Sequence, residues 1–177
     1  MNAKYYNQIA NSTAHRKSRD ENKQFIFTYP NYLSQLVGIA CTTEDKNHHK
    51  ACWILELICE ERMELFLPFI DEFCEALPNF KNNSAIRPVS KICLFLCKNK
   101  KVKLTKYQEE KIIETCLDFL IDVKLAATAA YSMRALFELG KKHSWINEEL
   151  KMLLSRDLQN QSPGYCFAVK DILKRLK

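Results

Sequence analysis

The side chains best suited to chemistry in this chain are its four histidines and eight cysteines. His48 and Cys52 are four residues apart, so they would share one face of a helix, and Cys93 and Cys97 have the same spacing. A zinc site takes four such donors, or three and a water molecule, and its usual Cys-x-x-Cys and His-Glu-x-x-His spacings do not occur in the sequence. We therefore expect buried thiols and surface histidines, and no metal ion.

The sequence also lacks the local patterns of an enzyme active site. It has no Gly-x-Ser-x-Gly turn around a nucleophilic serine and no glycine-rich loop for phosphate groups. Only Gly38, Gly140 and Gly164 occur, and so few glycines favour helices joined by short polar loops over a sheet with many tight turns. We expect an all-α protein with no catalytic residue, no cofactor and no enzymatic activity.

Hydropathy and cysteine usage predict a location. Residues 1–11 are polar and lack the apolar core of a signal peptide. The longest apolar stretch, residues 65–70, is far shorter than the roughly 20 residues of a membrane helix. Several cysteines lie among Leu, Ile and Phe at helical spacing, which predicts reduced core thiols at Cys52, Cys59, Cys93, Cys97 and Cys116. We expect a cytoplasmic protein that does not enter a membrane.

The elements that would position any site recur along the chain. Three segments align with one another, residues 51–59, 88–96 and 129–137, and a weaker copy covers residues 165–173. In this register one set of matched positions is Trp53, Ser90, Tyr131 and Phe167, and a second set is Leu55, Ile92, Met133 and Val169. A period near forty residues is typical of helical-repeat proteins.

Before each copy lies another segment with apolar residues at three- and four-residue spacing, which predicts a first helix for each repeat. These apolar stripes are Leu33, Leu36, Val37, Ala40; Phe66, Ile70, Phe73, Leu77; Ile113, Cys116, Leu117, Leu120; and Leu150, Leu153, Leu154, Leu158. About four helix pairs would therefore stack over residues 30–177. Residues 2–11 and 14–27 are expected to form two helices of an N-terminal cap over residues 1–29, within one domain of residues 1–177.

Helix starts and a kink are predicted from single residues. Thr105 with Gln108 has capping-box spacing, and Ser162 before a proline is expected to be an N-cap. Asp122 is expected to cap the second helix of the third pair. Pro68 lies inside a helical pattern and is expected to kink that helix.

Residues 84–92, Ser-Ala-Ile-Arg-Pro-Val-Ser-Lys-Ile, open a second helix, and Pro68 lies in a first one. This pattern resembles HEAT repeats. Over residues 30–177 the chain is similar to short HEAT-like proteins of Bacteroidetes-type bacteria, some of which carry the name adenylosuccinate lyase. The resemblance implies a HEAT/armadillo-like, right-handed α-solenoid. Thr128 stands at the position of Arg87 in the third repeat, which departs from the usual pattern.

The lyase name can be tested on the residues. Residues 83–91 resemble the mobile Ser-Ser-x-Met-Pro-x-Lys loop of that enzyme superfamily, but here they are expected to open an amphipathic helix. The chain is also too short for the long helical bundle that builds the active site of that superfamily. We expect no adenylosuccinate lyase activity.

In helical-repeat proteins, the second helices of successive pairs line an inner face that holds a partner. On these helices the chain carries bases and aromatics at Lys50, Trp53, Arg87, Lys91, Tyr131, Arg134 and Lys170, followed by Lys174. The favoured interpretation is a scaffold that holds a protein or peptide. The alternative is a DNA-binding protein or an alkyl-base DNA repair protein of HEAT-like fold, since bases neutralise phosphates and aromatic rings stack on nucleobases.

The charge pattern bears on this choice. The net charge is +6, and every charged residue between positions 83 and 106 is a base. This basic segment follows an acidic block between Glu56 and Glu75. The acidic block would repel the phosphates of DNA unless it lies on another face of the protein. A charge block is most often a solvated face. The matched aromatics are expected to pack between repeats more often than to face solvent, whereas Arg87 and Lys91 are expected to be exposed.

Overall fold

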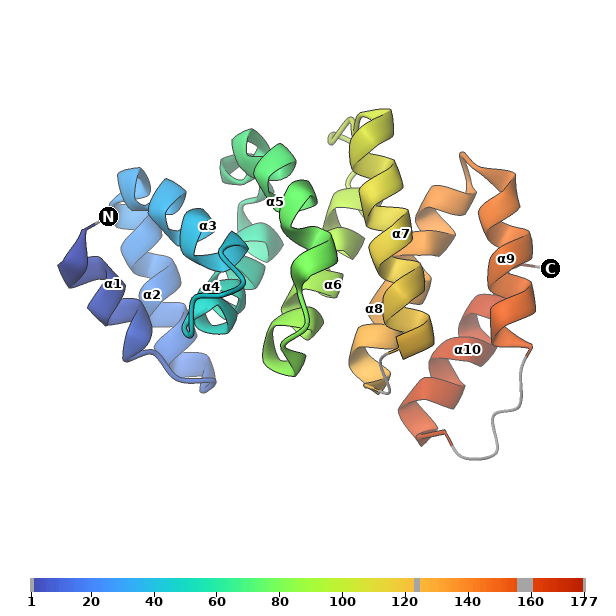
Figure 1. Ribbon diagram of the computed structural model, residues 1–177. Helices are drawn as coiled ribbons and strands as arrows, with labels where there is room; N and C mark the ends of the chain where they lie inside the picture. Colours follow the sequence, from blue (N-terminus) through green and yellow to red (C-terminus); the bar gives the residue numbers. More distant parts are fainter. Residues whose placement is uncertain (1, 123–124, 156–160, 177) are drawn as a thin grey trace. The chain divides into compact units, whose positions relative to one another are not determined.

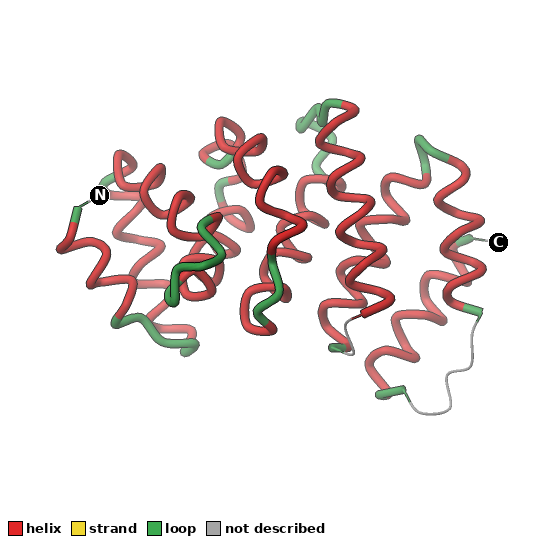
Figure 2. Tube along the Cα trace, viewed as in Figure 1, coloured by secondary structure: helices red, strands yellow, loops and turns green. Residues whose placement is uncertain are grey.

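The computed structural model describes residues 2–122, 125–155 and 161–176. Within these ranges every element is a helix or a 3-10 turn and no strand occurs, so the all-α prediction is confirmed (Figure 2). The chain divides into two compact units, residues 1–92 and 93–177, and the boundary falls within helix α6. The single domain, the number of repeats and the handedness of the stack stay predictions.

The first unit contains five helices and the start of a sixth, with 3-10 turns between some of them (Figure 1). The elements are α1 (Ala3–Ala10), α2 (Arg16–Thr28), η1 (Pro30–Tyr32), α3 (Leu33–Cys41), α4 (His48–Glu61), η2 (Met63–Leu65), η3 (Leu67–Phe69), α5 (Ile70–Ala76), η4 (Leu77–Asn79) and α6 (Asn83–Lys98). Helices α1 and α2 occupy the two segments predicted at the N-terminal end, and both pack against α4. Helix α3 packs against α4 as the first of the predicted pairs.

The prediction for Pro68 is wrong in its local geometry. Pro68 lies in the short 3-10 turn η3, and helix α5 begins only at Ile70. A proline has no backbone N–H to donate and disfavours the helical conformation of the residue before it, which accounts for a break in the helix at this point. The stripe residues Phe66, Phe73 and Leu77 are nevertheless buried, as the periodicity predicts.

The second unit contains the rest of α6 and the helices α7 (Lys106–Asp122), α8 (Ala126–Gly140), α9 (Ser144–Leu154) and α10 (Pro163–Arg175). Helix α8 contacts α7, α9 and α10, so it is the centre of this unit (Figure 1). The stripe position Leu158 lies outside the described residues.

Two of the three predicted helix starts are confirmed in atomic detail. The Thr105 N–H donates to the Gln108 side chain at 2.9 Å and the Gln108 N–H donates to the Thr105 hydroxyl at 3.2 Å, which is a complete capping box. The Ser162 hydroxyl accepts a hydrogen bond from the Tyr165 N–H at 3.3 Å. The prediction for Asp122 is wrong, because Asp122 is the last residue of α7 and the residue at the N-cap of α8 is Leu125.

One of the two matched sets is buried, as the predicted register requires. Leu55, Ile92, Met133 and Val169, the matched apolar set, are all 0% exposed. Among the predicted core thiols, Cys52, Cys59, Cys93 and Cys116 are buried and Cys97 is half-buried. No helix in the described residues is both long and apolar enough to cross a bilayer.

Candidate functional site

The predicted binding residues divide between the two units, and their environments differ. Lys50, Trp53, Arg87 and Lys91 belong to the first unit, whereas Tyr131, Arg134 and Lys170 belong to the second. Each of the four in the first unit makes a specific contact inside the protein, which is described next.

Arg87 and Lys91 on α6 neutralise a buried carboxylate on α4. An Arg87 Nη2 donates to Glu56 Oε2 at 3.0 Å, and Lys91 Nζ donates to Glu56 Oε1 at 2.9 Å and to Glu60 Oε1 at 3.2 Å. The Glu56 side chain is 3% exposed and that of Lys91 16%. The prediction that Lys91 is exposed is therefore wrong: a buried carboxylate must be paired, and the α6 bases are the groups that pair it.

The protonation of Lys91 follows from the same contacts. Burial by itself lowers the pKa of Lys91, but its hydrogen bonds to Glu56 and Glu60 and their negative charges outweigh burial, so the pKa is raised. Lys91 therefore stays protonated at neutral pH, and its ion pairs with Glu56 and Glu60 link α6 to α4.

Trp53 donates a hydrogen bond to a backbone carbonyl of α6 that lacks its usual helical donor because of Pro88. Pro88 is inside α6 and has no N–H, so the carbonyl of Ser84, four residues earlier, lacks its usual helical donor. The Trp53 indole N–H donates to this carbonyl at 2.8 Å. Trp53 therefore satisfies the Ser84 carbonyl of α6. The sequence pattern around Trp53 did not predict this hydrogen bond.

We predict that Trp53→Phe lowers the free energy of unfolding by about 1 kcal/mol, because it leaves the Ser84 carbonyl without a donor. The loss should be smaller in a Pro88→Ala background, where the alanine would supply the missing backbone N–H. Urea unfolding followed by circular dichroism measures both. Trp145→Phe is the matched control, since Trp145 is 55% exposed; an equal loss in the two backgrounds contradicts the assigned role.

Lys50 is bound to the end of another helix. Its Nζ donates to the carbonyl of Ala10, the last residue of α1. The last carbonyls of a helix have no intrahelical partner, and a lysine ammonium is a favourable one. None of the four first-unit residues is thus an uncommitted binding group.

The second-unit residues lie on an open face. Tyr131 and Arg134 are half-buried on α8, and Lys170 and Lys174 are exposed on α10. Phe167, one turn before Lys170, is 70% exposed. The expectation that the matched aromatics pack between repeats therefore fails at Phe167, because α10 is the last helix in the described residues and its outer side carries no further element of this unit.

Helices α8 and α10 run side by side in parallel. A Cβ placed on Gly164 would lie 3.9 Å from the Ala126 Cβ, and eleven residues further along both helices the Arg175 guanidinium carbon lies 6.0 Å from the centre of the Phe137 ring. On each helix the residues three and four apart share a face. On each helix, the buried residues lie to one side of the line of contact between α8 and α10. Arg134 on α8 and Phe167 on α10 lie to the other side of this line. Because the two helices are parallel, both residues face the same side of the helix pair.

We name this surface the α8–α10 face and define it by Tyr131, Arg134, Phe167, Lys170 and Lys174. The two acids beside it are already paired: Asp171 accepts from Arg175 at 3.0 Å, and Glu138 binds Lys141. Arg134, Lys170 and Lys174 make no ion pair with another described residue. The face therefore combines an exposed aromatic ring with three positive charges that are not paired with any acid among the described residues.

A second buried carboxylate was not predicted from the sequence. The side chain of Glu109 on α7 is 8% exposed. Its two carboxylate oxygens accept hydrogen bonds from Lys142 Nζ at 2.8 and 3.0 Å. His143 Nε2 lies 2.8 Å from Glu109 Oε2. Burial raises the pKa of Glu109, but the hydrogen bonds and charges of Lys142 and His143 outweigh it, and the pKa is lowered. The contacts join the start of α7 to the α8–α9 turn; they are structural and leave no open substrate site.

We predict that this carboxylate stabilises the protein in a pH-dependent way. Because the pKa of Glu109 is lower in the folded state, its contribution is present above its ordinary pKa of 4.5 and is lost as the pH falls through the folded pKa. Glu109→Gln should lower the free energy of unfolding by about 1–2 kcal/mol at pH 7 and by less at pH 3.5. Urea unfolding at the two pH values measures this, and a loss that is equal at both contradicts it.

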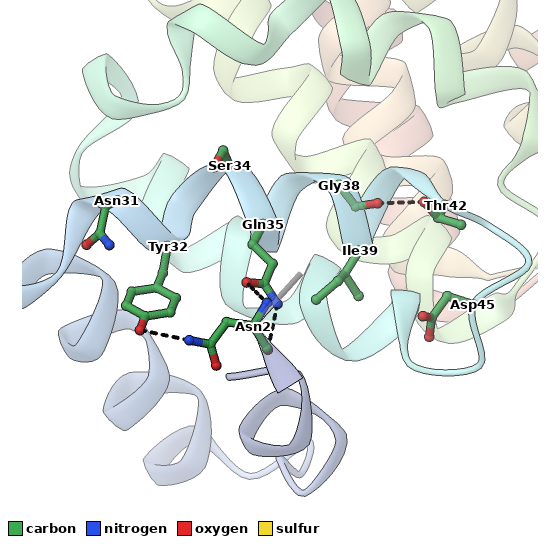
Figure 3. A pocket seen from close by; sticks show the side chains of 9 residues that line it. All are labelled: Asn2, Asn31, Tyr32, Ser34, Gln35, Gly38, Ile39, Thr42 and Asp45. Carbon is green, nitrogen blue, oxygen red and sulfur yellow. Dashed lines mark hydrogen bonds between the residues drawn. The ribbon is translucent and has the colours of Figure 1, made fainter. Parts of the chain in front are cut away.

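A shallow hollow of about 660 Å³ in the first unit is lined mostly by polar side chains (Figure 3). Its polar groups largely bind one another: the Asn2 N–H donates to the Gln35 side chain and the Gln35 amide donates back to the Asn2 carbonyl, both at 3.0 Å. Asp45, the one charged lining residue, already accepts from the Tyr6 hydroxyl at 3.0 Å. The other titratable lining residue, Tyr32, accepts a hydrogen bond from the Asn2 side chain at 3.3 Å, so both titratable side chains of the hollow already have partners within the protein.

The expectation of surface histidines is wrong for His48, which lies in the core together with Cys52. His48 is 4% exposed and stacks on Phe80 with ring centres 6.0 Å apart, and Cys52 is 1% exposed. Burial lowers the pKa of His48. Among the residues that the structure describes, no three metal-binding side chains come together.

Comparison with known proteins places the chain in a family. The sequence pattern of one family, described as a HEAT repeat domain, matches residues 7–176. No curated protein and no solved structure matches the chain. Because the matched segment covers nearly the whole sequence and the helices carry the recurring buried positions described above, the chain belongs to the HEAT repeat domain family.

Proposed function

We propose that the protein is a non-enzymatic scaffold that holds a protein or peptide partner on the α8–α10 face. The observation that carries the proposal is Phe167, 70% exposed beside Lys170, Lys174 and Arg134, which have no acidic partner among the described residues. HEAT repeats commonly mediate protein interactions. The same proposal includes the finer architecture: four helix pairs in a right-handed solenoid, residues 1–29 as its cap, and a cytoplasmic location.

The chemistry of the face defines the partner. An exposed aromatic ring next to cations is a suitable binding hot spot, because it can bury large apolar area while the cations pair with carboxylates around it. The complementary partner is an acidic segment that carries at least one large apolar side chain. Pairing at the rim raises the association rate and fixes the register, while burial of Phe167 supplies most of the affinity.

A peptide-display selection on the full chain tests this proposal. We expect enriched peptides with clustered Asp or Glu around an aromatic or aliphatic residue. The dissociation constant of a synthetic enriched peptide, measured by fluorescence anisotropy, should rise at least about tenfold in Arg134→Glu/Lys170→Glu and by a similar factor in Phe167→Ser. The control with the same charge change is Lys17→Glu/Lys81→Glu, at exposed lysines of the first unit. Enrichment of peptides that ignore the first two variants contradicts the proposal.

The DNA-binding alternative rests on exposed lysines at the end of α6, in the loop that follows and at the start of α7: Lys98, Lys100, Lys101, Lys103 and Lys106. Against it, the bases Arg87 and Lys91 of the predicted DNA face are already neutralised by Glu56 and Glu60. Binding of a labelled duplex should therefore be weak. Tight binding that falls steeply with salt, with no selected peptide, would favour the alternative.

We further propose that the chain has no adenylosuccinate lyase activity. The segment that resembles the mobile loop of the lyases, residues 83–91, lies in helix α6. Incubation of the purified chain with adenylosuccinate, followed by absorbance, should show no turnover.

A further inference from the structure

A small cavity at the start of the first unit is lined by aromatic rings. It has a volume of about 240 Å³ and is bounded by side chains of α1, of α2 and its end, and of η1: Asn2, Lys4, Tyr5, Gln8, Phe25, Tyr29 and Tyr32. The rings contact one another, with centres 5.3 Å apart for Tyr5 and Phe25, 4.9 Å for Tyr5 and Tyr32, and 5.0 Å for Phe25 and Tyr29. The cavity is roomier than the roughly 150 Å³ that holds a benzene molecule.

One of the rings that line the cavity carries a buried polar group without a partner among the described residues. Tyr5 is 2% exposed, and its hydroxyl has no hydrogen-bond partner among the described residues. A buried hydroxyl without a partner costs about 1–3 kcal/mol. Burial also raises the pKa of Tyr5, so this hydroxyl remains a proton donor. A core position that needed only a ring would be filled at lower cost by phenylalanine.

The charge of the wall selects the class of ligand. Lys4 is the charged side chain of the lining, is exposed, and makes no ion pair with another described residue, and the lining contains no carboxylate. A cationic ligand would find aromatic faces but would meet the Lys4 ammonium without an opposing acid. A flat ring that bears an acidic group can instead stack on Tyr29 and Tyr32 and pair with Lys4.

We propose that this cavity, formed by Lys4, Tyr5, Phe25, Tyr29 and Tyr32, is a binding site for a small aromatic carboxylic acid. The site belongs to the first unit and is independent of the α8–α10 face, so the two proposals stand or fall separately. The aromatic ring supplies the affinity, and the carboxylate supplies the selectivity against neutral and cationic aromatics.

Titration of the full chain with indole-3-acetate, followed by amide shifts in nuclear magnetic resonance spectra, tests the site. We expect saturable shifts that centre on residues 2–8 and 25–32. Cyclohexylacetate, which keeps the charge without an aromatic ring, and phenethylamine, which keeps a ring but reverses the charge, should each bind at least about fivefold more weakly. Equal binding of phenethylamine, or shifts centred elsewhere, would overturn the proposal, as would the absence of saturable shifts.

Variants separate binding from folding. Tyr29→Ala should weaken binding about fivefold because a stacking face is lost, and Tyr107→Ala, at a comparably exposed tyrosine of α7, should leave it unchanged. Tyr5→Phe should raise the melting temperature of the ligand-free chain, because it removes a buried hydroxyl that has no partner among the described residues.

Discussion

Replacing both Arg87 and Lys91 with methionine is expected to lower the free energy of unfolding by about 3–5 kcal/mol, because the buried Glu56 carboxylate loses its two bases. Glu56 is 3% exposed and accepts hydrogen bonds from both at 2.9–3.0 Å. Water cannot replace these partners at a buried site, so the cost is that of an uncompensated charge. Urea unfolding at pH 7 measures the change.

The control for this prediction is the same double substitution in a Glu56→Leu variant. In Glu56→Leu the same double substitution should cost much less, because no buried charge is left unpaired. Lys151→Met, which removes an exposed lysine paired with Glu148, should change stability by less than about 0.5 kcal/mol. A loss of equal size with and without Glu56 would show that Arg87 and Lys91 stabilise the protein by packing alone.

The second large effect concerns two residues of the repeat register. Met133→Ala should lower the free energy of unfolding by about 2–5 kcal/mol, because it opens a cavity in a close-packed core. Phe167→Ala removes a larger side chain, yet it should cost less than about 0.5 kcal/mol, because Phe167 is 70% exposed whereas Met133 is 0% exposed. Thermal and urea unfolding of the two variants measure the difference.

The contrast also validates the binding experiment. If Phe167→Ala is as stable as the parent chain, loss of peptide binding in a Phe167 variant reports on the α8–α10 face and not on folding. A large destabilisation by Phe167→Ala would instead mean that this ring packs against the protein in solution, and it would remove the main support for the proposed binding face.

The sequence alone determined the helices and their core because these depend on short-range chemistry. Apolar spacing of three and four residues places Leu55 and Met133 on a buried face whatever the partner helix is. Thr105 with Gln108 and Ser162 with its following proline satisfy orphan backbone groups within a few residues, so their roles follow from local geometry. Pro68 shows the limit of this reasoning, because the apolar spacing around it is the same for one kinked helix and for a helix that is interrupted by a 3-10 turn.

The binding residues could not be chosen from the sequence, because a basic or aromatic residue on a second helix has the same local pattern whether it faces solvent or a neighbouring helix. The tertiary structure decided this by bringing Glu56 to Arg87 and Lys91, the Ser84 carbonyl to Trp53, and the end of α1 to Lys50. These partners are more than thirty residues away in the sequence. Arg134, Lys170 and Phe167 were left as the open set because no described acid or helix covers them, and only packing between helices determines that.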